Sequence, residues 1–150
     1  CHASVLSYLD LKGRVMVDAY LQMASLLVVA LLFGGMLLFS AGFAAFLFKY
    51  LPPADVRMLL RKAFPPFYLF VIFSSGLAAA LTFLFDPFSA TLMAAVMLTT
   101  IPARQMLMPA INLATDSGLK KRFLWLHGFS VFLTLGHIVL AALALIHIGG

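Results

Sequence analysis

Four long apolar stretches follow one another along the chain, separated by short polar segments. They cover about residues 19–48, 65–85, 89–114 and 123–148. The first passes about thirty residues without a charge. As a helix it would be roughly 45 Å long, more than the ~30 Å hydrocarbon core of a bilayer. The pattern therefore predicts four transmembrane helices.

Short polar segments join these stretches and fix their order. A very short turn at 86–88 requires the second and third spans to be antiparallel neighbours. In the first connection, Val56, Leu59 and Leu60 share one helical face, away from the basic side chains, which is typical of a helix lying in the headgroup region. We predict an all-α, integral membrane four-helix up-down bundle with a short cytoplasmic interfacial helix at about 54–63.

The composition supports this interpretation. Hydrophobic residues make up 64% of the chain and charged residues 10%, against roughly 25% charged residues in ordinary soluble domains. The mean hydropathy is +1.10. The single cysteine excludes an intramolecular disulfide. Residues 1–18 are predicted as an N-terminal extension, and residues 19–150 as one transmembrane domain.

The charge distribution predicts the orientation. The net charge is +5, and most basic residues gather in the connections 49–64 and 115–122. By the positive-inside rule these connections face the cytoplasm and both termini face the other side. The expected partners are the lipid bilayer and anionic headgroups at the cytoplasmic face. No nucleic-acid-binding motif is present, so no nucleic acid is expected.

Counting from the predicted turns, every span brings a polar side chain to a similar depth in the cytoplasmic half. These residues are Ser40, Ser74, Ser75, Arg104, His127 and Ser130. Asn112, near the third connection, is added to them as a further candidate. We predict that they form a layer that binds a ligand.

Arg104 is the most informative of these residues, because no acidic residue on any span lies near its depth. A charged side chain at a helix centre costs about 2.5–3.5 kcal/mol on the insertion scale. One explanation is structural: the cation meets the negative end of the helix dipole and reaches toward headgroups. The other is functional: the guanidinium faces an anion or substrate. The sequence leaves both open.

The histidines of the last span allow a different chemistry. His127, His137 and His147 recur every ten residues and so do not share a helical face. His127 is interpreted first as an interfacial residue, and His137 as a hydrogen-bonded core residue opposite Thr99 and Thr100. As alternatives, either one could ligate haem or a metal.

Methionine gives a weaker indication of copper. Met93 and Met97 lie at i, i+4 spacing, and thioethers bind Cu(I), but methionine is also common filler in apolar cores. We expect no cofactor, with haem or copper as the alternatives. The sequence has no Ser-His-Asp arrangement, phosphate-binding glycine loop or paired carboxylates, so we predict a non-enzymatic protein.

Several segments resemble a known family. The stretches LLFGGMLLFSAGFAAFLF (31–48), MPAINLATD (108–116) and FLWLHGFSV (123–131) are similar to a small four-helix membrane domain of unknown function, DUF4149-like. Many bacteria share that domain, as does a eukaryotic transmembrane protein linked to cisplatin resistance. The similarity covers roughly residues 18–148.

The layout is also weakly similar to the copper-resistance D-type and protoporphyrinogen oxidase membrane families. Those families typically carry a histidine early in the first span, where this chain has Gln22. The main resemblance implies a four-helix protein of the bacterial inner membrane with a link to export of small solutes or metal compounds. It supplies no catalytic residues.

The leading hypothesis is a membrane protein that binds or helps move a small solute, either an anion or a metal complex, through the polar layer. Arg104 would supply charge, while Asn112, His127 and Ser130 would orient the ligand. Four spans seldom enclose a conduit, so a homo-oligomer or a membrane-protein partner is expected. The alternatives are a haem- or porphyrin-binding redox protein using His127 or His137, and an accessory or assembly subunit of a larger complex.

Overall fold

The structure, a computed structural model, describes the backbone of residues 2–150 and the side chains of residues 11–150. Over that range it is helical, without strands. The elements are α1 (His2–Leu37), the π-helical turn η1 (Leu38–Phe43), α2 (Ala44–Tyr50), α3 (Pro53–Thr82), α4 (Pro87–Pro102), the π-helical turn η2 (Ala103–Leu107), α5 (Met108–Asp116) and α6 (Lys120–Gly149). The all-α prediction is confirmed.

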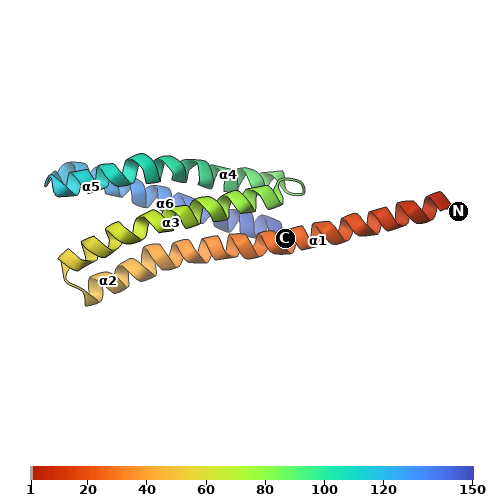
Figure 1. The fold of residues 1–150 in the computed structure, drawn as a ribbon, viewed down its shortest axis with the longest axis horizontal. Coiled ribbons are helices and arrows are strands. Elements are labelled where there is room, and N and C mark those ends of the chain that lie inside the picture. Colours follow the sequence, from red (N-terminus) through yellow and green to blue (C-terminus); the bar gives the residue numbers. More distant parts are fainter. Residues whose placement is uncertain (1) are drawn as a thin grey trace.

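These elements form four rods (Figure 1). The first rod is α1, η1 and α2 without a break; α3 is the second; α4, η2 and α5 form the third; α6 is the fourth. α3 packs against α1 and α4, and α6 packs against the same two rods, which closes a four-membered bundle. α1 projects beyond the bundle at the end where the C-terminus lies (Figure 1). The predicted four-helix bundle is confirmed.

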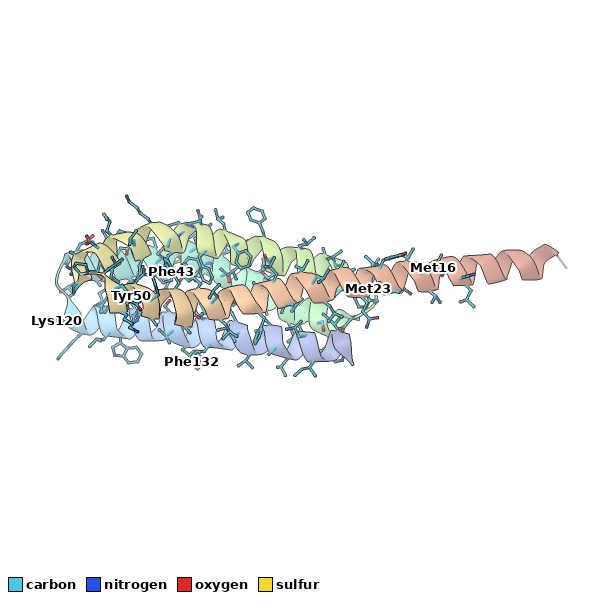
Figure 2. All side chains as sticks on the ribbon, turned by 90° about the horizontal axis from the view of Figure 1, so that it is seen from below. Met16, Met23, Phe43, Tyr50, Lys120 and Phe132 are labelled. Atoms are coloured by element: carbon cyan, nitrogen blue, oxygen red, sulfur yellow. The ribbon has the colours of Figure 1, made fainter. Side chains whose placement is uncertain are left out.

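The outer surface of the bundle is apolar. Large side chains such as Phe132 stand on it (Figure 2), and Trp125 is 82% exposed and Phe132 74% exposed. Within the described part of the chain, three helices are long and apolar enough to cross a membrane: those over Leu11–Tyr50, Pro53–Thr82 and Lys120–Gly149. The third rod is divided by η2 into shorter helices. Such a surface is stable only in a lipid environment, so the protein is an integral membrane protein.

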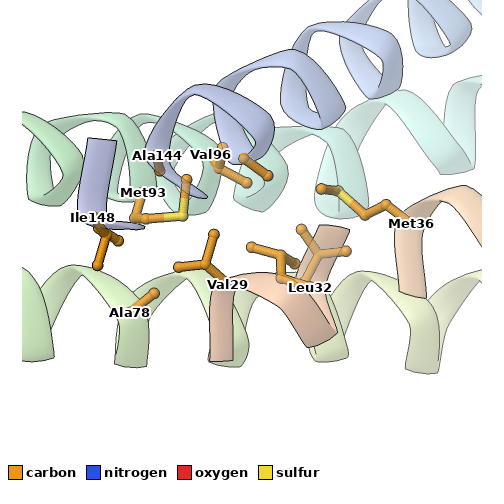
Figure 3. Packing of buried hydrophobic residues seen from close by; sticks show 10 residues of the cluster. Val29, Leu32, Met36, Ala78, Met93, Val96, Ala144 and Ile148 are labelled. Atoms are coloured by element: carbon orange, nitrogen blue, oxygen red, sulfur yellow. The ribbon is translucent and has the colours of Figure 1, made fainter. Parts of the chain in front are cut away.

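The interior is a single apolar cluster to which all four rods contribute (Figure 3). Its fully buried members are Val29, Leu32, Met36, Val71, Ala78, Met93, Val96, Ala141, Ala144 and Ile148. Three of the ten are alanines, and small residues allow the helices of a membrane bundle to approach closely.

Glycines mark the closest helix contacts. A Cβ placed on Gly35 of α1 would lie 2.8 Å from ring carbons of Phe70 on α3. A Cβ on Gly76 of α3 would lie 2.9 Å from the sulfur of Met97 on α4. The adjacent Gly34 has open space instead. Gly35 and Gly76 are therefore positions at which a side chain of the neighbouring helix fills the volume that a Cβ would occupy.

The predicted separate interfacial helix at 54–63 is wrong. Those residues are the first turns of α3, which continues through the tandem prolines Pro65 and Pro66 to Thr82. Two prolines remove the amide donors for the carbonyls of Arg61 and Lys62. Both residues are exposed, so solvent or headgroups can satisfy these carbonyls and the helix is not broken. The predicted extension over residues 1–18 likewise runs from His2 into the first rod without interruption.

The two ends of the bundle differ in charge. One end, which we call the basic end, comprises α2, the start of α3, the end of α5 and the start of α6. It carries Lys49, Arg57, Arg61, Lys62, Lys120, Lys121 and Arg122. The opposite end contains the turn between α3 and α4 and the C-terminal turn of α6.

A glycine-dependent turn joins α5 to α6 at the basic end. The Leu119 amide donates to the Ala114 carbonyl at 3.0 Å, and the Gly118 amide donates to the Thr115 carbonyl at 3.2 Å. This pair of bonds is a Schellman motif, which requires a left-handed residue after the helix. Gly118 has φ +66° and fills that role.

Candidate functional site

Three contacts between rods fix which residues lie at the same depth. Gly76 of α3 faces Met97 of α4, and His137 of α6 contacts Thr99. About two helical turns from the first contact toward the basic end lie Tyr68 on α3 and Arg104 on η2. The Ser130 hydroxyl of α6 interacts with Tyr68. Tyr68, Arg104 and Ser130 therefore share one depth, which we call the Arg104 level.

Arg104 stands on the irregular part of its rod. Pro102 ends α4, and the π-helical turn Ala103–Leu107 follows before Pro109 in α5. Proline has no amide hydrogen and its ring clashes with the preceding turn of a helix, so the locally widened π turn can accommodate Pro109. π-helical turns of this kind are often found at functional sites.

The guanidinium of Arg104 is not satisfied by the protein. The residue is half-buried, its Nε is fully covered, and this Nε has no hydrogen-bond partner. No acidic side chain among residues 11–150 pairs with it. A covered donor without an acceptor is costly, and such groups in native structures often mark an ion or ligand site.

Tyr68 and Ser130 supply hydroxyl groups at the same depth. Tyr68 is only 7% exposed, so its hydroxyl lies inside the bundle, where it interacts with that of the half-buried Ser130. Tyr68 was missing from the predicted layer. Its position in the apolar run Phe67–Phe73 hid it, although a tyrosine within a span usually places its hydroxyl beside a polar partner.

A second polar level lies deeper in the bundle. His137 is buried, and its Nε2 lies 2.7 Å from Oγ1 of Thr99, as the predicted pairing of the two spans required. The Thr99 hydroxyl donates to the Ala95 carbonyl at 2.6 Å, so its oxygen must accept the proton on Nε2. His137 is thus a hydrogen-bonded core residue, and a haem iron or metal at Nε2 would have to displace this bond.

The predicted serines of the second span belong to this deeper level. Ser74 and Ser75 precede Gly76 directly and so lie near the depth of Thr99 rather than of Arg104. The Ser75 hydroxyl is buried and donates to the Val71 carbonyl of its own helix at 2.6 Å. The hydroxyl hydrogen of Ser75 is therefore donated within α3.

The other predicted ligand residues are apart from the Arg104 level. Ser40 is exposed and donates to the Met36 carbonyl in its own rod. Asn112 is half-buried on α5, about two turns from Arg104. His127 is exposed, and its ring stacks on Phe123 one turn earlier at a centroid distance of 5.3 Å. The structure therefore groups Arg104 with Ser130, but leaves Ser40, Asn112 and His127 outside that group.

The described residues show no ready-made metal centre. Among them, no group of three or more His, Cys, Asp or Glu side chains could hold a metal ion together. Met93 is fully buried in the apolar cluster, and Met97 packs on Gly76. These thioethers serve as core packing in the structure.

The opposite end holds a hydrogen-bonded side-chain pair that the sequence analysis missed. Nδ1 of His147 lies 3.0 Å from Oδ2 of Asp86, and the His147 ring also contacts Phe88. Nearby, Nε2 of Gln22 donates to the Ile148 carbonyl at 2.6 Å. The sequence contains a signal for this contact, because Asp86 lies in the turn between the second and third spans and His147 lies in the last turn of the last span, at the same end of the bundle.

Asp86 also caps α4. Its Oδ1 accepts from the Ser89 amide at 3.1 Å, and its side chain is 8% exposed. Burial on its own would raise the pKa of Asp86, but the hydrogen bonds from Ser89 and His147 outweigh burial and lower that pKa below its ordinary value. This carboxylate is therefore held ionised in the folded protein.

Comparison with known proteins identifies the family. The family model described as "Domain of unknown function (DUF4149)" matches residues 27–120. The chain belongs to the DUF4149 family. No curated protein and no solved structure matches it.

The DUF4149 match covers about the second half of the first rod, all of α3, and the third rod with its turn. It includes Arg104 and Asn112 and ends at Lys120, so His127 and Ser130 on α6 lie outside it. The function of the DUF4149 family is unknown.

Proposed function

We propose that this DUF4149 protein is a non-enzymatic membrane protein that binds a small anionic solute at the Arg104 level. The single observation that supports this most strongly is the half-buried Arg104 guanidinium with a covered Nε and no acceptor. An anion that binds its terminal nitrogens would compensate a cation that the protein leaves unpaired. The hydroxyls of Tyr68 and Ser130 lie at the same depth and would contribute hydrogen bonds.

The depth of Arg104 favours a ligand over lipid headgroups. Arg104 lies about 18 Å along the rod from Asp116, the last residue of α5, at 1.5 Å per residue. We propose that the basic end faces the cytoplasm, as the positive-inside rule requires. The solute would then be bound in the cytoplasmic half of the membrane, and the termini would lie on the other side.

The resemblance to the membrane domain linked to cisplatin resistance also implies the handling of small solutes or metal compounds. Anionic metal complexes therefore belong among the ligands to be tried. Passage of a solute across the membrane would require a second copy of this chain or another membrane protein, because four rods around an apolar cluster leave no conduit.

The test is ligand-dependent thermal stabilisation of the detergent-purified protein by phosphate, sulfate and tetrachloroplatinate. At least one anion should raise the melting temperature of the wild type, and Arg104→Gln should abolish that rise. The control variant Arg122→Gln removes an exposed cation at the start of α6, and its melting temperature should still rise when the anion is added. The proposal fails if no anion stabilises the wild type, or if Arg104→Gln responds as the wild type does.

A role as an accessory subunit is the second candidate, because one outward groove on α6 could receive a partner helix. The groove encloses about 480 Å³ and is lined by Leu124, Trp125, Gly128, Phe129 and Phe132. A glycine flanked by large apolar side chains suits close packing of a second transmembrane helix. Native mass spectrometry from mild detergent discriminates the two: a stoichiometric foreign subunit favours assembly, and a homo-oligomer or monomer contradicts it.

A further inference from the structure

A cleft of about 340 Å³ opens at the basic end, between the first turns of α3 and the last turn of α5. It is lined by Arg57, Met58, Arg61, Lys62, Thr115 and Asp116. Its volume lies at the lower end of the range for small-molecule pockets. None of the residues of the Arg104 level lines it, so it is a separate place on the molecule.

Positive charge is in excess in this cleft. Nη2 of Arg61 donates to Oδ1 of Asp116 at 2.8 Å, and this pair joins α3 to α5. The side chains of Arg57 and Lys62 make no hydrogen bond or ion pair with any residue whose side chain the structure describes. Three cations thus meet one carboxylate, and two of the three have no acidic partner.

The spacing of the cations favours the binding of a counter-charge. Arg57 and Arg61 stand at i and i+4 on α3, where like charges destabilise a helix. An anion bound to Arg57 would weaken that repulsion, and Lys62 lines the same cleft. Guanidinium presents paired N–H donors to phosphate oxygens, and ammonium adds a point charge, so this pair of side chains suits a phosphate group. Met58 gives the cleft an apolar wall beside these cations.

We propose that this cleft binds the phosphate group of an anionic phospholipid, with Arg57 and Lys62 as its direct ligands. Arg61 keeps its ion pair with Asp116, and this pair fixes the distance between α3 and α5, the two walls of the cleft. A lipid fits better than a soluble phosphate because α3 runs from the cleft directly into the apolar part of the bundle, so acyl chains could lie along its surface. The same chemistry would accept a free phosphate, and the experiment has to separate the two.

The experiment measures lipid retention by native mass spectrometry on the full chain in mild detergent. Phosphatidylglycerol is the anionic probe, phosphatidylcholine is the probe without net charge, and inorganic phosphate is the soluble competitor. The test variant is Arg57→Gln with Lys62→Gln. The matched control is Lys120→Gln with Lys121→Gln, which removes the same charge from exposed positions at the same end but outside the cleft.

The wild type should retain phosphatidylglycerol in preference to phosphatidylcholine. The test variant should lose at least about tenfold in apparent affinity, as expected for two cations near a charged headgroup, and the control should stay within about twofold. Arg104→Gln should retain the lipid fully, which separates this site from the proposed solute site. Equal losses in the test and control variants would show a general surface attraction and overturn the proposal. If millimolar inorganic phosphate displaces the lipid, the assignment of the cleft as a lipid site is overturned.

Discussion

Nδ1 of His147 lies 3.0 Å from Oδ2 of Asp86, and this contact ties the last turn of α6 to the turn between α3 and α4. Asp86 also accepts from the Ser89 amide at the start of α4. One carboxylate therefore connects three rods at the end of the bundle opposite the basic end. Its ionisation should matter for stability.

We predict that acid destabilises the protein through Asp86. The pKa of Asp86 is lowered in the folded state, so the stability it contributes is present above the ordinary aspartate pKa and is lost as the pH falls through the lowered value. Asp86→Asn should lower stability at neutral pH by about 1–3 kcal/mol and should flatten the acid side of the melting profile. Melting temperatures in detergent from about pH 3 to pH 7 measure both effects. Asp55→Asn, an exposed aspartate in the first turn of α3, is the control and should leave the acid slope unchanged.

The two adjacent glycines of α1 should respond in opposite ways to alanine. In Gly35→Ala the new methyl group would meet the Phe70 ring at 2.8 Å, so α1 and α3 must separate or the ring must move. We expect a loss of about 1–3 kcal/mol, typical of overpacking. Gly34→Ala meets nothing within 4 Å and should be neutral or slightly stabilising, because alanine favours the helix. Equal melting temperatures for the two variants would contradict the close α1–α3 contact.

Gly118→Ala should destabilise the turn between α5 and α6. Gly118 has φ +66°, a conformation that costs a residue with a Cβ about 1–2 kcal/mol. Gly128→Ala, in the interior of α6 with open space around it, should instead be neutral or stabilising. Limited proteolysis at the turn and the melting temperature together report the difference. A Gly118→Ala protein as stable as Gly128→Ala would exclude the left-handed turn.

The bond between Thr99 and the buried His137 should contribute measurably to stability. Thr99→Val keeps the shape but removes the oxygen that accepts from Nε2 of His137, so a buried N–H loses its partner. Bonds of this type inside membranes contribute about 0.6–1.7 kcal/mol, and we expect a loss in that range. Thr91→Val, at an exposed position where the hydroxyl bonds only to the Pro87 carbonyl, is the control. If both variants melt alike, the interhelical bond contributes nothing.

The sequence predicted the bundle because the apolar stretches and the short turns leave few alternatives. It also predicted the pairing of His137 with Thr99, since a tight hairpin between two spans fixes their register closely. It failed at Pro65 and Pro66, where the second span was predicted to begin after a separate interfacial helix. The tandem prolines lie near the exposed end of α3, where lost backbone bonds can be replaced, so α3 continues through them.

The candidate site was less predictable than the fold. The depth predicted for Ser74 and Ser75 was wrong by about one helical turn. The prediction put them level with Arg104, whereas in the structure they lie near the depth of Thr99. Prolines lie close to η2 in the sequence, but η1 has no sequence pattern that distinguishes it from an α-helix. The contact between Asp86 and His147 joins residues far apart in sequence, and only the relative rotation of α6 and α4 brings them within hydrogen-bonding distance.

The irregular backbone segments described above coincide in height. Phe39 of η1 stacks on Phe67 of α3 at 3.9 Å between ring centroids, close in sequence to Pro65 and Pro66, and η2 lies near the depth of Tyr68. Three of the four rods therefore lack regular backbone hydrogen bonding in one transverse plane. Bending should concentrate in that plane, so that the basic end tilts as a unit relative to the rigid remainder. Amide deuteration should be fastest there among the membrane-embedded segments.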